Sequence, residues 1–594
     1  MKETREKIHR ALAAVLPKNT EFNLTAPPNP EMGDLSLPCF PLAGTLQKSP
    51  PEVAGYLAAE IDKNAGLKSS VEKITASGPY LNFYLKSDML AKEILGEISK
   101  KKEKYGNIMA GKKKIMIEYV SPNSNKPLHL GHVRNALLGE SISNLLESQG
   151  RKVIRASLVN DRGVHVCKSM LAYQLWGKND SPEKSELKPD HFVVKYYAMF
   201  GERAKQNPEL TGEAQEMLKL WEAGDKKTAA LWKKMNSWVY EGWKSTYKTL
   251  GVKFDALDFE SRIYKKGKEI IYRGFKDGVF ARDEKGNYVA RFANLPDKVV
   301  LRADGTAVYA TTDLRLAEER FKKYGLDELI YVVGSEQDLH FRQLFEIFRQ
   351  LKFPWAEHVR HLNYSLILLP EGRLKSREGV KVDADELAAK LADMAEEEIR
   401  SRYEKLLSEK EIGRRAKIIA LAALKFYILN VGPSAAIHFN PKESLSFTGK
   451  TGPYLQYVCA RISSVIKKAR KQEIKKARKQ ESKKARKQEI KTTRNQESKK
   501  ANYKLLNTAV DKKLIAALGR FPEVLEQAAK ELNPSELTSY LYNLSKDFSD
   551  FYESEPILKA EKNVAAARLA LIRAVQIVLA RGLNLLGIET LEEM

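Results

Sequence analysis

The chain contains few cysteines. Only Cys39, Cys167 and Cys459 occur in 594 residues. They lie far apart, so no Cys-x-x-Cys pair predicts a zinc site and no cluster predicts a disulfide framework. This usage is typical of a protein of the reducing cytoplasm.

Segments that would place the chain in or across a membrane are also missing. The first residues, MKETREK, are polar and lack the apolar core of a signal peptide. No run of roughly 18 or more apolar residues predicts a membrane span. We therefore expect a cytoplasmic protein.

A Walker phosphate loop is missing as well, because no G-x-x-x-x-G-K-[ST] pattern occurs. Positive charge, by contrast, is in excess: 101 Lys and Arg against 76 Asp and Glu give a net charge of +25. Such an excess favours a polyanionic partner, and nucleic acid is the first candidate. The length and the 43% hydrophobic content predict three or four globular domains.

Part of the charge comes from an octapeptide repeat at residues 467–498. Its units read KKARKQEI, KKARKQES, KKARKQEI and KTTRNQES, with net charges of +3, +3, +3 and +1. They supply +10 of the chain's +25, so the remainder is still basic. The units contain good helix formers but almost no apolar stripe. A solvated helix or a disordered loop is the expected structure, and an RNA-binding arm is the alternative.

Short apolar runs alternate with helical patterns from residue 113 to about 370. The clearest runs are 115–120, 153–159 and 329–333. This alternation predicts a parallel sheet with helices on its faces, that is, a Rossmann-like α/β domain. Residues 177–256 within it are helix-rich and carry Trp232, Trp238 and Trp243, which we interpret as core residues of a helical insertion.

Other changes in pattern mark the remaining domains. Residues 1–105 predict a small α/β domain, whose strand GPYLNFYL spans 78–85. The Rossmann-like domain covers 106–380. A helical connection at 381–440 precedes an all-helical domain at 441–594, which carries the repeat as an insertion. Helices are expected at 385–401, at 412–429 and from about 564 to 587.

The most informative stretch reads SPNSNKPLHLGH at residues 121–132. It lies between a predicted strand and an amphipathic helix pattern, so His129 and His132 belong to a strand-to-helix turn. The unpaired N–H groups at a helix start favour an anion. Gly131 permits close approach of a nucleotide, and two imidazoles supply hydrogen bonds to phosphate oxygens. His-x-Gly-His also arises by chance, but this context favours an ATP site.

A second signal follows at residues 365–379, which read SLILLPEGRLKSREG. A strand pattern leads into a loop that begins at Gly372 and contains Arg373, Lys375 and Ser376. Basic loops of this kind stabilise charge that develops on a polyphosphate. Alone, the loop reads as a solvated basic turn. Together with the histidine turn, it has a more specific meaning.

The pair resembles the two signatures of class I aminoacyl-tRNA synthetases, and the surrounding residues resemble the arginyl-tRNA synthetases. The resemblance covers nearly the whole chain. It rests on the histidine turn and on GPYLNF at 78–83, YATTD at 309–313, QDLH at 337–340, TGPYLQY at 451–457 and LNLLGI at 583–588. It implies an additional N-terminal domain, a Rossmann-like catalytic domain and an all-helical anticodon-binding domain.

Two features depart from the family pattern. The second signature begins with Arg373 instead of lysine, and its usual fourth-position lysine is Ser376. In arginyl enzymes a lysine just before the histidine motif substitutes for it, and Lys126 holds that place, with Lys375 as a second candidate. The repeat falls in a short variable link of the family, so catalysis should not depend on it.

The resemblance implies that arginine and ATP give arginyl-adenylate and pyrophosphate, and that arginine then passes to the terminal ribose of tRNA(Arg). ATP is a substrate that carries Mg²⁺ with it, activation requires bound tRNA, and the family default is a monomer. The residues assigned to ATP are Lys126, His129, Gly131, His132 and Gly372, and those assigned to pyrophosphate are Arg373, Lys375 and Ser376.

The resemblance also implies the remaining contacts. Glu118 and Asp313 accept the guanidinium, and Tyr309 forms the wall of the pocket. The ammonium and carboxylate of the substrate fall to Ser121, Asn123 and Gln337. Contacts with tRNA are expected at Tyr80, Asn82, Phe83, Tyr454, Tyr457, Arg461 and Tyr552. By residue type alone, each acid is more often a structural ion-pair partner, and each aromatic is as often a core residue.

Three other functions stay open. A lysine-specific class I synthetase would also need an acidic pocket. A small-molecule nucleotidylyltransferase shares His-x-Gly-His, but such enzymes are short and need no large helical half. A non-catalytic RNA-binding protein explains the charge but not the paired signatures. ATP–pyrophosphate exchange with arginine and with lysine distinguishes these functions.

Overall fold

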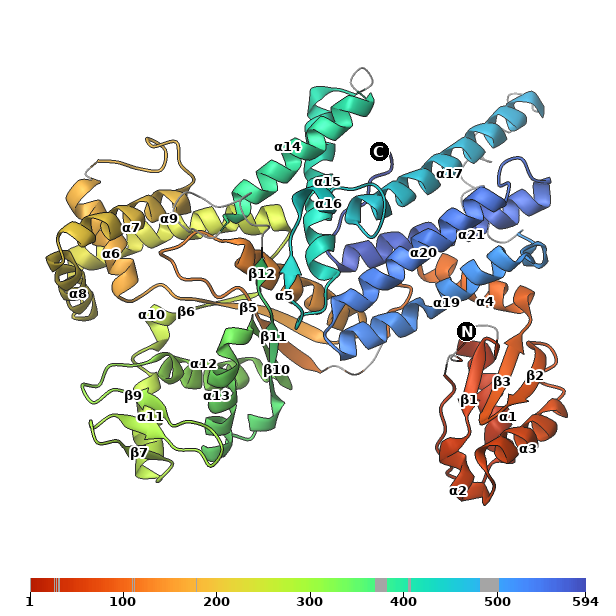
Figure 1. The fold of residues 1–594 in the computed structure, drawn as a ribbon, viewed down its shortest axis with the longest axis horizontal. Coiled ribbons are helices and arrows are strands. Elements are labelled where there is room, and N and C mark those ends of the chain that lie inside the picture. The colour runs from red at the N-terminus through yellow and green to blue at the C-terminus, as the bar shows by residue number, and fades with distance from the viewer. Residues whose placement is uncertain are drawn as a thin grey trace.

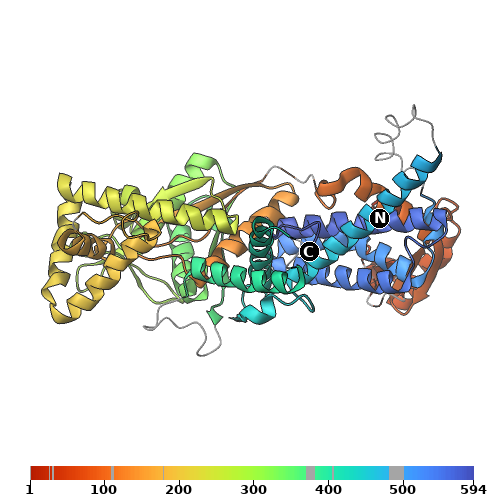
Figure 2. The same cartoon turned by 90° about the horizontal axis from the view of Figure 1, so that it is seen from above.

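The computed structural model describes residues 2–25, 27, 29, 32–108, 111, 113–177, 179–368, 382–403, 407–480 and 501–594. In Figure 1 a central sheet lies between a helical insertion at one end of the molecule and a group of long C-terminal helices at the other. The N-terminal domain lies below those C-terminal helices. Figure 2 shows the same elongated arrangement from above.

The N-terminal domain is a three-stranded antiparallel sheet covered by helices, in the order β1-β3-β2. Its elements are α1 (Lys2–Val15), β1 (Leu35–Pro38), α2 (Ala43–Leu46), α3 (Pro50–Asp62), β2 (Val71–Ser77), β3 (Tyr80–Leu85) and α4 (Ser87–Lys101). The predicted strand at 78–85 is therefore confirmed as β3. Helix α4 contacts α19 and α21 of the C-terminal half, so the two ends of the chain pack together.

The central sheet has five parallel strands in the order β11-β10-β4-β5-β6. They are β4 (Lys114–Glu118), β5 (Lys152–Val159), β6 (Ala256–Phe259), β10 (Glu328–Gly334) and β11 (Val359–Tyr364). The three predicted apolar runs are β4, β5 and β10, which confirms the parallel α/β prediction. Their side chains are mostly buried, because helices cover both faces of the sheet.

Helices connect these strands. They are α5 (Leu130–Ser148), α6 (Val164–Trp176), α7 (Pro189–Gln206), α8 (Glu209–Glu222), α9 (Lys226–Leu250), α10 (Glu260–Ile263), α11 (Gly267–Lys276), α12 (Tyr309–Tyr324) and α13 (Asp338–Gln350). Trp243 is buried, and Trp232 and Trp238 pack against the core, so their interpretation as core residues is confirmed. A small antiparallel sheet of β7 (Phe280–Arg282), β8 (Tyr288–Ala290) and β9 (Lys298–Leu301) was not predicted.

The C-terminal half is helical, as predicted, with one exception. Its helices are α14 (Ala384–Tyr403), α15 (Glu409–Leu429), α16 (Pro441–Ser444), α17 (Gly452–Gln480), α19 (Ala509–Lys530), α20 (Pro534–Ser554) and α21 (Lys562–Leu585). The exception is β13 (Ile437–His438), which pairs with β12 (Ile367–Leu368). Helix α21 has the length and hydropathy of a membrane span, but it packs against α17 and α20 in the domain core.

Short 3₁₀ helices complete the described structure. They are η2 (Phe40–Leu42), η3 (Lys102–Lys104), η4 (Ser335–Gln337), η5 (Ala356–His358) and η7 (Tyr503–Leu505).

The repeat begins inside α17. Ala469 of the first unit is buried, and Lys467 pairs with Glu592 and Glu593 near the chain end. The helix continues through Gln480, so the predicted helix is confirmed for residues 467–480. Residues 481–500, which hold the rest of the repeat, lie outside the described residues.

Candidate active site

The predicted site residues gather at the carboxyl ends of the central strands. From β4 the chain proceeds to β5 and β6 on one side, whereas β10 and β11 lie on the other side of β4. The order of the strands therefore reverses between β4 and β10. Open parallel sheets bind ligands at the carboxyl ends of their strands at such a reversal. The histidine turn follows β4 and therefore lies at this point.

The turn starts with a strained backbone. Val120 and Ser121 have φ of 71° and 39°, which is rare for residues other than glycine and most unusual for a β-branched one. The N–H of Val120 donates to Oδ1 of Asn135 at 2.7 Å, and Nδ2 of Asn135 donates to the carbonyl of Val332 at 2.9 Å. Helix α5 thereby fixes the turn to β10. Strain held in this way is typical of functional sites.

His129 and His132 form one unit at the start of α5. Nδ1 of His129 accepts the N–H of Gly131, and Nδ1 of His132 accepts the N–H of His129, both at 3.1 Å. The ring centroids are 3.8 Å apart. Because both Nδ1 atoms accept, each ring carries its proton on Nε2, where it is a donor suited to phosphate. A Cβ at Gly131 would lie 2.9 Å from Cε1 of His129, so glycine makes room for the imidazole.

Two residues further along α5, Arg134 is completely buried, its guanidinium lies 5.8 Å from the ring centroid of Tyr364, and its described hydrogen bonds all go to carbonyls. Its Nη1 donates to the carbonyls of Ser365 and Leu366, at 2.7 and 3.2 Å. Its Nη2 donates to three carbonyls at 2.8–3.3 Å, those of Gly432, Pro433 and Ala435. Burial lowers the pKa of Arg134 to about 10. One guanidinium thus joins the histidine helix to the segment before the second signature and to the turn before β13.

The structure describes only one of the remaining residues that were predicted to bind phosphate. Lys126 is exposed in the turn, between the strained backbone and His129. Gly372, Arg373, Lys375 and Ser376 lie outside the described residues, so their assignment stays a prediction. The chain reaches them from β12 and re-enters the described structure at Val382.

The predicted guanidinium pocket is centred on the first turn of α12. Tyr309 and Asp313 lie on this helix, and the Tyr309 side chain is largely solvent-exposed. Nε2 of His340 lies 2.9 Å from Oδ2 of Asp313, which fixes the carboxylate from helix α13. Gln337 is exposed in η4, directly before α13. The carboxylate and the phenol are therefore available to a ligand.

Glu118, the second predicted acceptor, is buried in an ion pair with Arg320. The Arg320 guanidinium also lies 2.9 Å from Oδ2 of Asp258. The other oxygen of Glu118 accepts the hydroxyl of Ser121 at 3.0 Å, and that Oγ in turn accepts the N–H of Leu158. A carboxylate offers about four acceptor positions, and these partners do not use all of them.

Glu260 was not predicted as a site residue. It starts α10 at the carboxyl end of β6 and is buried, and Arg162 lies 3.5 Å away. Burial raises the pKa of Glu260 to about 7, Arg162 opposes this, and the charges of Asp161 and Asp313 add to it. Glu260 therefore belongs to the same acidic group as Asp313. The only sequence signal was its place just after a strand.

Of the N-terminal residues predicted to contact RNA, two are wrong. Asn82 and Phe83 are 1% and 0% exposed, and Asn82 accepts the Ser36 hydroxyl at 2.7 Å. They lie on the central strand of the small sheet, where Phe83 is part of the hydrophobic core and Asn82 is a buried polar residue, so neither presents a surface to RNA. Tyr80 keeps an accessible edge and packs at 5.9 Å against Phe40, which is 56% exposed.

The C-terminal candidates form a group. The Arg461 guanidinium lies over the rings of Tyr457 and Tyr552, at 4.7 and 5.2 Å. Tyr454 is part-buried, and its hydroxyl pairs with Ser549. A stack of two phenols and a guanidinium at a surface suits unpaired bases.

Asn123, which was predicted to hold the ammonium or carboxylate of the amino-acid substrate, is exposed. Its backbone forms an isolated parallel β-bridge with Asn160.

Three family models match the chain. The model for tRNA synthetases class I (R), catalytic domain, matches residues 94–432. The model for the arginyl tRNA synthetase N terminal domain matches residues 2–85, and the model for the DALR anticodon binding domain matches residues 455–594.

Whole proteins match as well. The chain is 44% identical over 590 residues to the arginine–tRNA ligase of Treponema denticola, covering 98% of this chain and 96% of that one. It is 40% identical over 584 residues to the enzyme of Treponema pallidum, covering 97% and 95%. The solved Thermus thermophilus arginyl-tRNA synthetase superposes over the full length of both chains, with a TM-score of 0.78 and 25% identity. The Plasmodium falciparum enzyme matches in fold, with a TM-score of 0.77 and 17% identity over 100% and 99% of the chains.

Proposed function

Since the chain belongs to the arginyl-tRNA synthetase family of class I enzymes, we propose that its histidine turn binds ATP and that Asp313 selects arginine. The enzyme ligates arginine to tRNA: arginine and ATP give arginyl-adenylate and pyrophosphate, and the arginyl group then passes to the 3′-terminal ribose of tRNA(Arg). The observation that carries the proposal is the position of His129 and His132 directly after β4, the strand at which the order of the sheet reverses.

In the first step the arginine carboxylate attacks the α-phosphorus and pyrophosphate leaves. The carboxylate is already an anion, so no general base is needed, and positioning and charge stabilisation supply the catalysis. The Nε2–H groups of His129 and His132 and the ammonium of Lys126 donate to the ATP phosphates. Arg373, Lys375 and Ser376 are proposed to contact the pyrophosphate. Mg²⁺ is proposed to arrive on the ATP phosphates and neutralise part of their charge.

Recognition of arginine requires acceptors for a planar guanidinium with five donors. Asp313 supplies the charged acceptor, Glu118 a second one, and Tyr309 the wall of the pocket. Ser121, Asn123 and Gln337 are proposed to hold the ammonium and carboxylate of the amino acid. A site with buried acceptors rejects analogues without donors by roughly 10⁴-fold or more, so no editing domain is required.

Glu260 makes arginine binding depend on pH. With its pKa raised to about 7, Glu260 gains its negative charge between pH 6 and pH 8, beside Asp313. We expect KM for arginine to fall about fivefold over this range, since one more nearby charge attracts the guanidinium. The measurement is ATP–pyrophosphate exchange at fixed saturating ATP. Glu260→Gln should flatten the dependence, and an unchanged slope in that variant would remove Glu260 from the pocket.

The RNA contacts are proposed from aromatic groups that are exposed or partly exposed. Residues 1–105 would contact the tRNA elbow through Tyr80, and residues 441–594 would bind the anticodon through Tyr454, Tyr457, Arg461 and Tyr552. Residues 106–380 form the proposed catalytic domain, and 381–440 connect it to the helical domain. We further propose that the enzyme is a cytoplasmic monomer and that activation requires bound tRNA.

Deletion of residues 475–498 tests whether the repeat contacts RNA. The deletion spares the first unit, which carries the buried Ala469 and the Lys467 ion pairs, and removes units with net charges of +3, +3 and +1. If the repeat binds tRNA phosphates, the slope of log Kd against log salt becomes shallower by about one for each phosphate that the shortened enzyme no longer neutralises. The rate of ATP–pyrophosphate exchange with arginine, measured at saturating tRNA, should not change. An identical slope would mean that the repeat does not contact tRNA phosphates.

ATP–pyrophosphate exchange with each of the twenty amino acids, with and without total tRNA, tests the proposal. Exchange with arginine only, and only with tRNA present, is the expected result. Exchange with lysine would leave the fold but overturn the pocket assignment. Exchange with arginine in the absence of tRNA would overturn the proposed coupling alone.

A further inference from the structure

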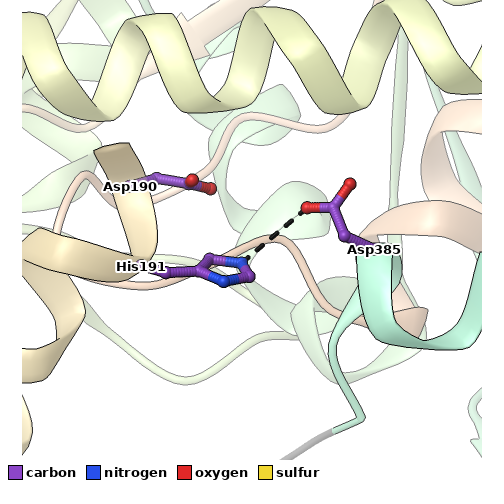
Figure 3. Close-up of side chains that lie close together, drawn as sticks. All are labelled: Asp190, His191 and Asp385. Atoms are coloured by element: carbon purple, nitrogen blue, oxygen red, sulfur yellow. Dashed lines mark ion pairs between the residues drawn. The ribbon is translucent and has the colours of Figure 1, made fainter. Parts of the chain in front are cut away.

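Charged side chains join the helical insertion to the start of α14 (Figure 3). Asp190 and His191 begin α7 and Lys188 precedes it, whereas Asp383 and Asp385 stand at the start of α14. Nε2 of His191 lies 3.2 Å from Oδ2 of Asp383 and 3.7 Å from Oδ2 of Asp385. Nζ of Lys188 lies 2.6 Å from Oδ2 of Asp385. We call these five residues the insertion junction.

Helix α9 closes the insertion junction from a third side. The Thr246 hydroxyl donates to Oδ2 of Asp385 at 3.0 Å and accepts from Nζ of Lys188. Gly242, one turn earlier, lets the buried Asp190 approach, because a Cβ there would lie 2.2 Å from its Oδ1. The junction is therefore a tightly packed contact between three helices.

The charges of the junction compensate one another. Nζ of Lys188 lies 3.3 Å from Asp190 as well as close to Asp385, so an ammonium already occupies the place between these carboxylates. The Asp383 carboxylate, 3.2 Å away, raises the pKa of His191, against the effect of burial, and Asp190 adds to the rise. Burial would raise the pKa of Asp383, but the nearby His191 and hydrogen bonds from backbone N–H groups hold it below its usual value.

The same segment of α14 pairs with the histidine turn. The N–H of Leu130 donates to the carbonyl of Val382, and the N–H of Ala384 donates to the carbonyl of Leu128, both at 2.9 Å. His129 and Asp383 are thus opposite residues of a short antiparallel bridge. Oδ1 of Asp383 also accepts two N–H groups at the start of α14. Any shift of Asp383 therefore moves the backbone of His129.

We propose that Lys188 and His191 of the helical insertion are positioning residues for ATP binding, because His191 holds Asp383, which pairs with His129, and Lys188 holds Asp385 two residues further on. They touch neither substrate. Their effect passes through Asp383 and Asp385 to the backbone of the histidine turn. This inference rests on the proposed role of that turn in binding ATP.

Steady-state ATP–pyrophosphate exchange on the full-length enzyme with tRNA tests the inference. His191→Ala is expected to raise KM for ATP about tenfold, with kcat and KM for arginine within about twofold of wild type, since a small displacement of a positioning contact weakens one substrate selectively. His191→Gln should recover most of the affinity, because its amide donates to Asp383. Lys205→Gln is the matched control, as Lys205 pairs with Glu202 in solvent on the same helix.

Asp383→Ser gives the same information if His191→Ala does not fold, since serine caps α14 but offers no carboxylate to His191. An unchanged KM for ATP, or a loss confined to kcat, would overturn the inference. So would one equivalent of tightly bound divalent metal in the purified enzyme, since the junction would then be a metal site. His132→Ala distinguishes failure of the proposed ATP site from failure of the junction inference. If His132→Ala impairs exchange and His191→Ala does not, only the junction inference fails. If neither variant affects exchange, the ATP site itself is misassigned.

Discussion

Replacing Asp313 by asparagine is expected to lower kcat/KM for arginine about a thousandfold, because a guanidinium loses its charged acceptor in a partly desolvated site. Asparagine has the same size, and its Oδ1 still accepts from His340, so the pocket keeps its shape. KM for ATP should change less than about threefold, since no phosphate contact is altered. The measurement is exchange at varied arginine and at varied ATP, with tRNA present.

Glu318→Gln is the matched control for this variant. Glu318 lies on the same helix, but it pairs with Arg273 and Arg315 on the outer face. Removal of its charge should leave both substrate constants within about twofold of wild type, since these ion pairs are partly exposed and contact no proposed substrate residue. Equal losses for arginine and ATP in Asp313→Asn would mean that Asp313 supports the whole site and does not select the amino acid.

Substitution of Arg134 by methionine is the second change with a large expected effect. It removes the guanidinium donor from five carbonyls. Those of Leu366, Gly432 and Pro433 keep a backbone N–H donor, whereas those of Ser365 and Ala435 lose the donor that the structure describes, at about 1–3 kcal/mol for each unsatisfied group. We expect the first thermal transition to fall by about 10 °C, because roughly 3–5 kcal/mol is lost from a domain of this size. Lysine should restore little, since a single ammonium cannot reach carbonyls on both sides.

The control for Arg134 is Arg291→Met. Arg291 is exposed, and its only described ion pair, with Asp297, is 4.0 Å long. Its loss should lower the transition by less than about 1 °C. Differential scanning calorimetry of both variants decides the question. If Arg134→Met unfolds at the same temperature as the control variant, water has replaced the guanidinium as the donor to the carbonyls. The link from α5 to the segments at 365–366 and 432–435 would then not be needed for stability.

Much of the fold could be predicted because its elements are long or strongly patterned. The apolar runs of β4, β5 and β10 and the helices α14, α15 and α21 agree with the predicted positions within a few residues. The sheet of β7, β8 and β9 escaped prediction because its strands are only three or four residues long, too short for an alternating pattern to develop.

Contacts between residues that are far apart in the chain could not be predicted from the sequence. The carbonyl partners of Arg134 lie 231 to 301 positions away, and nothing local in the sequence indicates that this arginine is buried. The burial of Asn82 and Phe83 depends on which strand takes the centre of the small sheet, and the alternation of β3 does not specify that. The histidine turn was recognisable because its residues are adjacent and its chemistry is local.

The packing of Arg134 also bears on how the enzyme is made. The histidine turn is synthesised in the first quarter of the chain, but the carbonyls of Gly432, Pro433 and Ala435 emerge from the ribosome about 300 residues later. Strand β4 likewise cannot pair with β10, and helix α4 cannot pack against α19 and α21, until those later elements have been synthesised. Such long-range closures make folding slow and leave unpaired strand edges exposed during translation. Nascent chains that end before residue 435 are therefore clients for chaperones, and ATP binding should begin only near the end of synthesis.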